Sequence, residues 1–245
     1  MRKKFVIIAP DTDCAKTITT SGLLTSAINK KIRSIASKPI QTGCSDRRSK
    51  DLDFAFSTAK LNVLTEIYEK LVLCKLKTPS SPLLASQLEN ISIDWDEIVK
   101  KIIEVSNDYD LFFIETAGGI YTPITCGNLG LQKSFIYKYG TNADFAKALK
   151  CPVLLSIPNR VGAISLGVMT VNCAKEHGLQ IAGAIFSQTV EPKTETDIAI
   201  LRDNVETFQY MTGVKVLANV PFIKNIENKS LAIYFDYAID FLINM

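Results

Sequence analysis

The sequence of 245 residues predicts one α/β domain, a doubly wound and mostly parallel sheet with helices on both of its faces. Three observations support this prediction. Short apolar runs alternate along the chain with longer stretches of helical period, as in strand–helix–strand units. The composition, 47% hydrophobic and 22% charged, is typical of a soluble globular domain. No glycine- or serine-rich linker, change of composition or internal repeat divides the chain, so we expect a single domain over residues 1–245.

The predicted elements follow from the period of the apolar residues. Strands are predicted where the apolar runs are short: residues 5–9, 32–37, 111–115, 153–157, 181–186 and 214–220. Helices are predicted where apolar residues recur every three or four positions: residues 17–29, 82–89, 95–105, 142–149, 163–177, 194–210 and 231–243. The last helix lacks the cationic face of a membrane-surface helix, so we expect it to pack on the sheet or on a partner subunit. The segment 44–76 is the least regular, and we expect substrate loops there if the protein is an enzyme.

Charge and hydropathy exclude several classes of partner. The net charge of +3 is spread along the chain, which gives no electrostatic footprint for nucleic acid or for an anionic membrane. The apolar run 5–9 is too short for a signal peptide, and no run approaches membrane-spanning length. We therefore expect a cytoplasmic protein whose partners are small molecules, with no binding to nucleic acid or membrane.

The numbers and positions of cysteine and histidine limit the kinds of catalytic and metal site that the chain can form. The six cysteines form no C-x-x-C pair, so we interpret them as reduced thiols. The single histidine, His177, precedes Gly178 at the predicted end of a helix, where an imidazole near the last carbonyls is a sufficient explanation. With one histidine, His-based zinc sites and Ser–His or Cys–His nucleophile pairs are hard to build. Most hydrolase functions are therefore excluded.

The first predicted strand runs into the segment A-P-D-T-D-C-A-K-T, residues 9–17, and then into a helix. This is the place of a phosphate-binding loop, in which a lysine contacts the β- and γ-phosphates and the next hydroxyl ligates Mg²⁺. Lys16 and Thr17 match those two roles. Ala9 and Ala15 stand where glycines are expected, so on this segment alone an ordinary turn before a Lys-Thr helix start stays open.

Further segments at the ends of later strands resemble one family. K-P-I-Q-T-G at 38–43, E-T-A-G-G at 115–119 and T-P-I at 122–124 are similar to the dethiobiotin synthetase motifs K-P-V/I-x-[ST]-G, E-G-A-G-G and [VT]-P-L. The first loop of that family has the form G-T-D-T-x-V-G-K-T. Weaker matches, in the same order as in the family, extend the resemblance over residues 5–222: S-P-L-L-A at 81–85, D-F-A at 144–146, C-P-V-L-L at 151–155, G-L-x-x-A-G at 178–183 and V-P at 220–221. The implied fold is that of the P-loop NTPases.

The resemblance implies a reaction that needs no nucleophile from the protein. An amine of 7,8-diaminononanoate takes up CO₂ to form a carbamate, the carbamate attacks the γ-phosphate of ATP, and the second amine closes the ureido ring of dethiobiotin. Such a mechanism asks the protein to position substrates and to stabilise charge, which fits a chain with a single histidine. The family also implies a homodimer.

Site residues follow from the same match. The expected catalytic residues are Lys16, Lys38 and Thr12. The expected Mg²⁺ ligands are Thr17, Glu115 and Asp53, with Asp51 left open as the alternative to Asp53. The nucleotide is expected to contact Asp13, Cys14, Ala15, Lys16, Thr17, Ile18, Ser187, Gln188 and Pro221, and the substrate is expected to contact Thr42, Gly118 and Gly119.

Plain structural roles stay open for three of these features. Lys38 could be a solvated strand-end lysine, Gly118 and Gly119 a simple turn, and Glu115 a surface carboxylate. Glu115, however, ends an apolar strand at the edge where doubly wound sheets bind ligands.

Departures from the family pattern raise two alternatives. Pro10, Ala15 and Thr116 depart from the family pattern, and Ala9, Ala15 and Thr116 would suit a catalytically silent paralogue that acts as a binding or scaffold protein. The segment 187–188 is Ser-Gln where the family usually has Asn, so we predict relaxed or altered nucleotide choice. A partitioning-type switch ATPase ranks last, because it needs a lysine where the sequence has Asp11 and Thr12.

Overall fold

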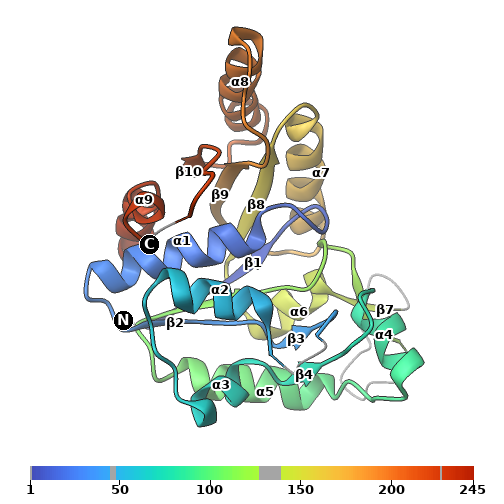
Figure 1. Cartoon of the computed structure of the whole chain (residues 1–245). Coiled ribbons are helices and arrows are strands. Elements are labelled where there is room, and N and C mark those ends of the chain that lie inside the picture. The colour runs from blue at the N-terminus through green and yellow to red at the C-terminus, as the bar shows by residue number, and fades with distance from the viewer. Residues whose placement is uncertain (1, 45–47, 127–138, 227) are drawn as a thin grey trace.

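The computed structural model describes residues 2–44, 48–126, 139–226 and 228–245 (Figure 1). The strands in these residues are β1 (Lys3–Ile8), β2 (Ser34–Ser37), β3 (Ile40–Gln41), β4 (Cys74–Lys75), β5 (Leu111–Glu115), β6 (Pro123–Cys126), β7 (Tyr139–Thr141), β8 (Val153–Asn159), β9 (Ile181–Gln188) and β10 (Val216–Val220). The helices are α1 (Lys16–Asn29), α2 (Lys50–Thr58), α3 (Thr65–Leu71), α4 (Pro82–Glu89), α5 (Trp95–Ser106), α6 (Asn142–Leu149), α7 (Ala163–Glu176), α8 (Glu195–Thr212), α9 (Asn228–Ala232) and α10 (Asp236–Asn244).

The central sheet has the strand order β10-β9-β8-β1-β5-β2, and each of its strand pairs is parallel in the described part of the chain. The predicted doubly wound α/β fold is therefore confirmed, and the six predicted strands are those of this sheet. The strands β2 and β5 lie on one side of β1, and the later strands β8, β9 and β10 lie on its other side, so the strand order reverses at β1. Ligands bind at such a switch point in open parallel sheets, so the loop after β1 lies where a site is expected.

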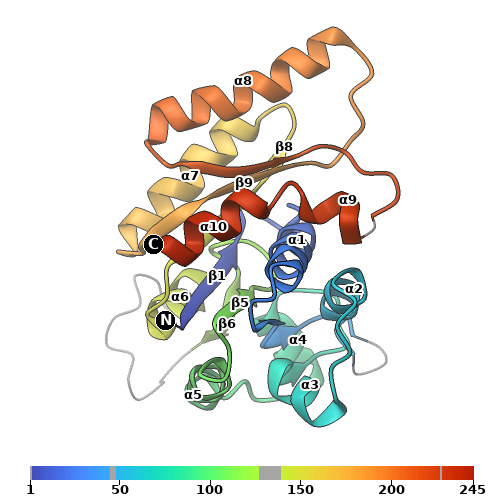
Figure 2. The ribbon, with the colours of Figure 1, turned by 90° about the vertical axis from the view of Figure 1, so that its left-hand side faces the viewer.

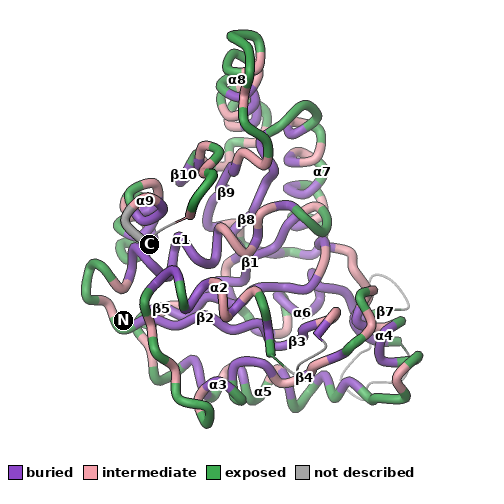
Figure 3. Tube along the Cα trace, in the orientation of Figure 1, coloured by how far each residue is buried: buried purple, intermediate pink, exposed green. Residues whose placement is uncertain are grey.

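Helices cover both faces of the sheet. Helices α1, α9 and α10 lie on one side of β1, with α9 and α10 both in contact with α1, whereas α6 and α7 lie on the other side (Figure 2). Between these layers β2, β5 and β8 are buried along their length, and β1, β9 and β10 over most of it, as the purple core shows in Figure 3. A sheet buried on both faces needs apolar side chains on both faces, which explains why its strands are apolar runs without alternation.

Capping residues explain where several helices begin or end. Ser81 caps α4 by accepting a hydrogen bond from the N–H of Leu84 at 3.3 Å, and Pro82 follows at the first helical position. Thr141 begins α6 with a reciprocal capping box to Asp144. His177 ends α7 as predicted, where its buried Nδ1 donates to the carbonyl of Cys173 at 3.0 Å.

Two sequence expectations are wrong. The described residues of the segment 44–76 are not irregular, because they contain α2, α3 and β4. Ser49 begins α2 by accepting from the N–H of Leu52 at 3.2 Å, a cap signal present in the sequence. The single helix expected at 231–243 is two helices, α9 and α10, separated by a turn that places Phe235 against α1. The second of these packs on α1 and β10, in agreement with the expected packing on the sheet.

The described cysteines form no disulfide, in agreement with the reading as thiols. None of the helices in the described part of the chain combines the length and apolar composition that a bilayer-spanning segment needs.

The packing of Phe235 on Gly22 gives a test of this fold. A Cβ added to Gly22 would lie 2.0 Å from the Phe235 ring, which is fully buried. Gly22→Ala should therefore lower the free energy of unfolding by about 1 kcal/mol or more, although alanine is the better helix former. Urea unfolding measures the loss, and Phe235→Leu in the same chain should restore part of it. If the stability losses of Gly22→Ala and Phe235→Leu simply add in the double variant, the contact between Gly22 and Phe235 is contradicted.

Candidate active site

An open cavity of about 850 Å³ lies at the carboxyl ends of β1, β5, β9 and β10. Its walls come from the loop after β1, the chain after β2, the start of α2, the segment before α4, and the ends of β5, β9 and β10. Most sequence-predicted site residues line it: Thr12, Asp13, Cys14, Ala15, Lys16, Thr17, Ile18, Lys38, Thr42, Glu115, Gly118, Ser187, Gln188 and Pro221. Asp53 and Gly119 are not among the lining residues.

The loop after β1 contains no glycine and has left-handed backbone at two positions. Asp13 and Ala15 have φ values of 53° and 56°, in the left-handed region that favours glycine. Helix α1 begins immediately after Ala15, and its first turn carries no acidic side chain. Its N-terminal N–H groups therefore adjoin the cavity with the positive end of the helix dipole, an arrangement suited to an anion.

Lys16 lies at the start of α1 with its ammonium turned toward the loop. Its Nζ donates to the carbonyl of Asp11 at 2.8 Å, and the side chain is buried beside the cavity. Burial lowers the pKa of Lys16, and the charge of Glu115 opposes this shift. A lysine held by one backbone carbonyl can exchange that weak partner for a phosphate oxygen.

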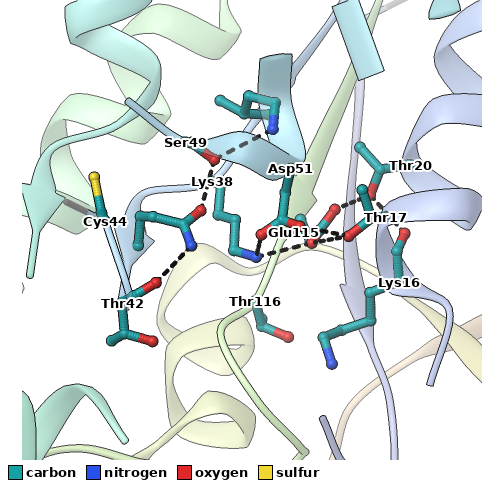
Figure 4. A network of polar contacts seen from close by, with 12 residues as sticks. Lys16, Thr17, Thr20, Lys38, Thr42, Cys44, Ser49, Asp51, Glu115 and Thr116 are labelled. Atoms are coloured by element: carbon teal, nitrogen blue, oxygen red, sulfur yellow. Dashed lines mark hydrogen bonds and ion pairs between the residues drawn. The ribbon is translucent and has the colours of Figure 1, made fainter. Parts of the chain in front are cut away.

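A polar cluster joins four elements at the floor of the cavity (Figure 4). The ammonium of Lys38 forms ion pairs with Asp51 and with Glu115, at 3.0 Å from Oε1 of Glu115. The Thr17 hydroxyl lies 2.9 Å from Oδ1 of Asp51 and 3.2 Å from Oε1 of Glu115. Thr20, one turn further along α1, donates to Oε2 of Glu115 at 2.6 Å.

Mutual attraction favours the charged forms of Lys38 and Asp51. Burial lowers the pKa of Lys38, but the charges of Glu115 and Asp51 outweigh it and raise the pKa overall. Burial alone raises the pKa of Asp51, and the ammonium of Lys38 reverses the shift, so the net effect is a lowered pKa. Lys38 is thus an ion-paired residue of the site rather than a solvated strand end.

Asp51, and not Asp53, faces the cluster. Asp53 lies two residues further along α2 and pairs with Arg48, at 2.6 Å from Nη2 and 3.0 Å from Nε. Residues two apart in a helix point to different sides, so only one of the two carboxylates can face Thr17 and Glu115. The direction of α2 therefore places Asp51 in the cluster and Asp53 outside it.

Three residues that the sequence analysis did not single out, Ser49, Gln41 and Tyr68, hold the start of α2 in this direction. The side chain of Ser49 donates to Oε1 of Gln41 at 2.6 Å, and its backbone N–H donates to the hydroxyl of Tyr68 at 2.8 Å. Gln41 in turn donates to the carbonyl of Thr42 at 2.8 Å. The cap at Ser49 was readable from the sequence, whereas its partners are brought together only by the fold.

The donor set at Thr17, Asp51 and Glu115 suits a magnesium ion shared with a nucleotide. All three offer hard oxygen atoms, and Mg²⁺ in nucleotide sites typically takes one or two carboxylates while phosphates and water supply the rest. In the described parts of the chain, no group of three His, Cys, Asp or Glu side chains forms a self-sufficient metal site. The residues present therefore fit a metal that arrives with phosphates.

The two glycines after β5 have different surroundings. Gly118 lines the cavity with φ +79°, and an added Cβ would lie 2.4 Å from Oγ1 of Thr122. Gly119 instead packs under the first loop, where a Cβ would lie 2.3 Å from the carbonyl oxygen of Pro10. Thr116, which departs from the family pattern, ties the end of β5 to β1 by donating to the carbonyl of Ile7 at 2.9 Å.

The far end of the cavity is formed by the ends of β9 and β10. Oε1 of Gln188 accepts from the N–H of Phe222 at 3.1 Å, so its amide NH₂ remains the donor of that side chain. The buried hydroxyl of Ser187 has no hydrogen-bond partner among the described residues. Apolar side chains complete this end: Val220, Pro221, Phe222, Ile223 and Ile226.

The buried cation gives a stability test. Lys38→Met would leave Asp51 and Glu115 without their shared cation, so we expect the free energy of unfolding at pH 7 to fall by about 3 kcal/mol. The matched control is Lys30→Met, because Lys30 pairs with Asp240 at 2.8 Å near the surface and should lose less than about 1 kcal/mol. Urea unfolding in the presence of a chelator measures both. Equal losses would contradict the buried network.

Comparison with known proteins assigns the chain to a family. A family model described as "AAA domain" matches residues 3–230. The ATP-dependent dethiobiotin synthetase BioD of Anoxybacillus flavithermus is 32% identical over 233 residues, which cover 94% of this chain and 96% of that protein. The protein of the same name from Clostridium perfringens is 31% identical over equal shares of both chains.

Solved structures agree in fold. A chain of the MinC:MinD cell division complex of Aquifex aeolicus superposes with a TM-score of 0.56 at 14% identity, covering 99% of this chain and 94% of that one. A ParA family ATPase from Chlorobium tepidum gives a TM-score of 0.53 at 10% identity over 100% and 98%. With the polar cluster around the first loop and the relatives at about a third identity, the chain belongs to the dethiobiotin synthetase family of the P-loop NTPase fold.

Proposed function

We propose that this protein is a dethiobiotin synthetase, a cyclo-ligase that carboxylates 7,8-diaminononanoate and closes a ureido ring at the expense of a nucleoside triphosphate. The observation that carries the proposal is the convergence of Lys16, Thr17, Lys38, Asp51 and Glu115 on one cavity. These residues supply cations and metal ligands, and they include no protein nucleophile. The membership of the chain in this family supports the same reaction.

The first loop would bind the phosphates. The N–H groups at the start of α1 and the Lys16 ammonium face anionic oxygens there, and Thr17, Asp51 and Glu115 would hold Mg²⁺. Asp51 takes the place that the sequence analysis gave to Asp53. When bound, the metal ion neutralises charge on the phosphate oxygens. The chain's own part is to hold these ligands in place before the nucleotide arrives.

The chemical steps take place on substrate atoms. One amine of the diamine adds to CO₂, and a proton leaves as the carbamate forms. A carbamate oxygen attacks the γ-phosphorus, the nucleoside diphosphate leaves, and a carbamic–phosphoric anhydride results. The second amine attacks the carbamate carbon, and inorganic phosphate and a proton leave as the ring closes.

Residues of the cavity would stabilise the charge that moves in these steps. Lys38 and Lys16 face the oxygens that gain negative charge in phosphoryl transfer, and Thr12 offers a hydroxyl on the same wall. Thr42 and the backbone at Gly118 would contact the diamine. Gly119 is assigned a supporting place under the first loop. His177 is buried at the end of α7 and does not line the cavity, so no step is given to it.

The nucleotide base would lie against the ends of β9 and β10. The relatives are named as ATP-dependent enzymes. The Gln188 carbonyl already accepts a hydrogen bond from Phe222, so this amide faces a base mainly as a donor. We therefore propose that the base is read loosely and that ATP is accepted alongside other triphosphates.

Assembly and location complete the proposal. We propose a homodimer in the cytoplasm, as the family resemblance implies. Light scattering after size-exclusion chromatography tests the dimer, with a mass twice the 27.1 kDa chain as the expected result.

A silent scaffold role gains no support from the geometry, because Ala15 keeps the left-handed loop conformation and the charged residues of the site remain together.

The test of function is incorporation of labelled bicarbonate into acid-stable product. Purified protein is supplied with 7,8-diaminononanoate and Mg²⁺, and with ATP, CTP or GTP in parallel reactions. We expect incorporation that depends on the diamine and on a triphosphate, with more than one base accepted. No incorporation with any nucleotide, from folded protein beside an active control enzyme, would overturn the proposal.

A pair of variants tests the metal ligands. Asp51→Asn should reduce kcat/KM by about 100-fold, because it removes a charged oxygen ligand, and should raise the Mg²⁺ concentration needed for half-maximal rate. Asp53→Asn removes a carboxylate from the same helix turn and should stay within about threefold of the parent. Steady-state rates across a Mg²⁺ series measure both. A larger loss for Asp53→Asn would return the ligand to that residue.

A further inference from the structure

One polar side chain of the central sheet lies outside the proposed chemistry. Ser156 interrupts the apolar part of β8, is fully buried, and does not line the cavity. Its hydroxyl lies directly under the first loop, at 2.7 Å from the carbonyl oxygen of Cys14. Thr19 of α1, also fully buried, places its Oγ1 3.0 Å from the same hydroxyl. A buried strand hydroxyl is unfavourable unless its hydrogen bonds are made, so these two contacts explain its presence.

The direction of these hydrogen bonds is fixed. A carbonyl oxygen only accepts, so Ser156 donates its single proton to Cys14. In its contact with Thr19, Ser156 must then be the acceptor and Thr19 the donor. The result is a one-way chain of two hydrogen bonds from α1, through β8, to the backbone of the loop.

This chain sets the orientation of one peptide group. The carbonyl of Cys14 and the N–H of Ala15 belong to the same planar trans peptide and therefore point in opposite directions. With the carbonyl held down on Ser156, the N–H of Ala15 points away from the sheet, on the side of the loop where Ala15 lines the cavity. That N–H is one of the donors that the start of α1 offers to an anion.

The orientation is held against strain. Ala15 has φ 56°, and an L-residue with a Cβ is strained in the left-handed region. Glycine would adopt it without that strain. Without an anchor, Ala15 would relax toward ordinary φ values and turn the peptide, which would remove its N–H from the cavity.

We propose that Ser156, oriented by Thr19, is a positioning residue that holds the Cys14–Ala15 peptide with its N–H toward the nucleotide phosphates and so offsets the missing glycine at position 15. The inference rests on the proposed binding of nucleotide at the first loop. It deepens that proposal by explaining how a phosphate loop without glycine keeps its shape.

The first experiment compares two buried strand serines. Ser156→Ala removes the anchor, and Ser34→Ala is the matched control, because Ser34 is buried in β2 and donates to the carbonyl of Ile32 at 3.1 Å, away from the site. Calorimetric titration with ATP and Mg²⁺ should show about tenfold weaker binding for Ser156→Ala and less than about twofold change for Ser34→Ala. In steady-state assays of the proposed reaction, Ser156→Ala should raise the KM for ATP and leave the KM for the diamine unchanged.

The second experiment repeats Ser156→Ala in a chain that carries Ala15→Gly. Because glycine favours φ > 0 as readily as φ < 0, the anchor matters less there, and the loss of ATP affinity should shrink to about threefold or less. Thr19→Val keeps the shape of the threonine, removes its donor, and should weaken ATP binding in the same direction. It gives a second route to the result if Ser156→Ala folds poorly.

The outcomes separate this inference from the proposed function. ATP binding that is equally weakened by Ser156→Ala and Ser34→Ala, or an effect of Ser156→Ala that is unchanged by Ala15→Gly, would overturn the positioning role. Parent protein that binds ATP and shows the expected pattern, yet forms no product from the diamine, would overturn the proposed reaction and leave the positioning role standing. Parent protein that binds no nucleotide would overturn both.

Discussion

The site depends on the burial of one ammonium between two carboxylates. Lys38 follows β2, Asp51 lies in α2 and Glu115 ends β5. Lys38 and Glu115 are buried and Asp51 is partly exposed, and a charge buried here without a partner would lose much of its hydration. Their mutual attraction fixes α2 against the sheet and leaves Asp51 and Glu115 aimed at Thr17. The charged groups that hold these elements together are also the groups that a metal ion and a phosphate would contact.

The first loop is the second constraint, and it works by shape rather than by charge. A phosphate loop needs its N–H groups on one side, which requires left-handed backbone where glycine is normally found. Here Asp13 and Ala15 adopt that backbone. Gly119, in the turn after β5, packs against Pro10 of the loop, and Ser156 of β8 donates a hydrogen bond to the carbonyl of Cys14. Contacts with rigid neighbouring segments can thus hold the left-handed backbone that a glycine usually provides.

Much of the fold was readable from the sequence because the signals are local. Apolar runs located the strands of the central sheet, and the cap at Thr141 lies at the start of a predicted helix. Two elements differ from the prediction for different reasons. The signal for α2 is local, the cap at Ser49, whereas the turn within 231–243 has no local signal, because its position is set by the packing of Phe235 on α1.

By itself the sequence determined the fold class, the loop that follows the first strand, and most of the residue types that line the cavity, because each depends on a short run of neighbouring residues. The tertiary structure alone decided that Asp51 and not Asp53 faces Glu115, and that Ser156 reaches Cys14. Both depend on how α2 and β8 are placed against α1. Such placements come from packing between distant segments, which no local pattern records.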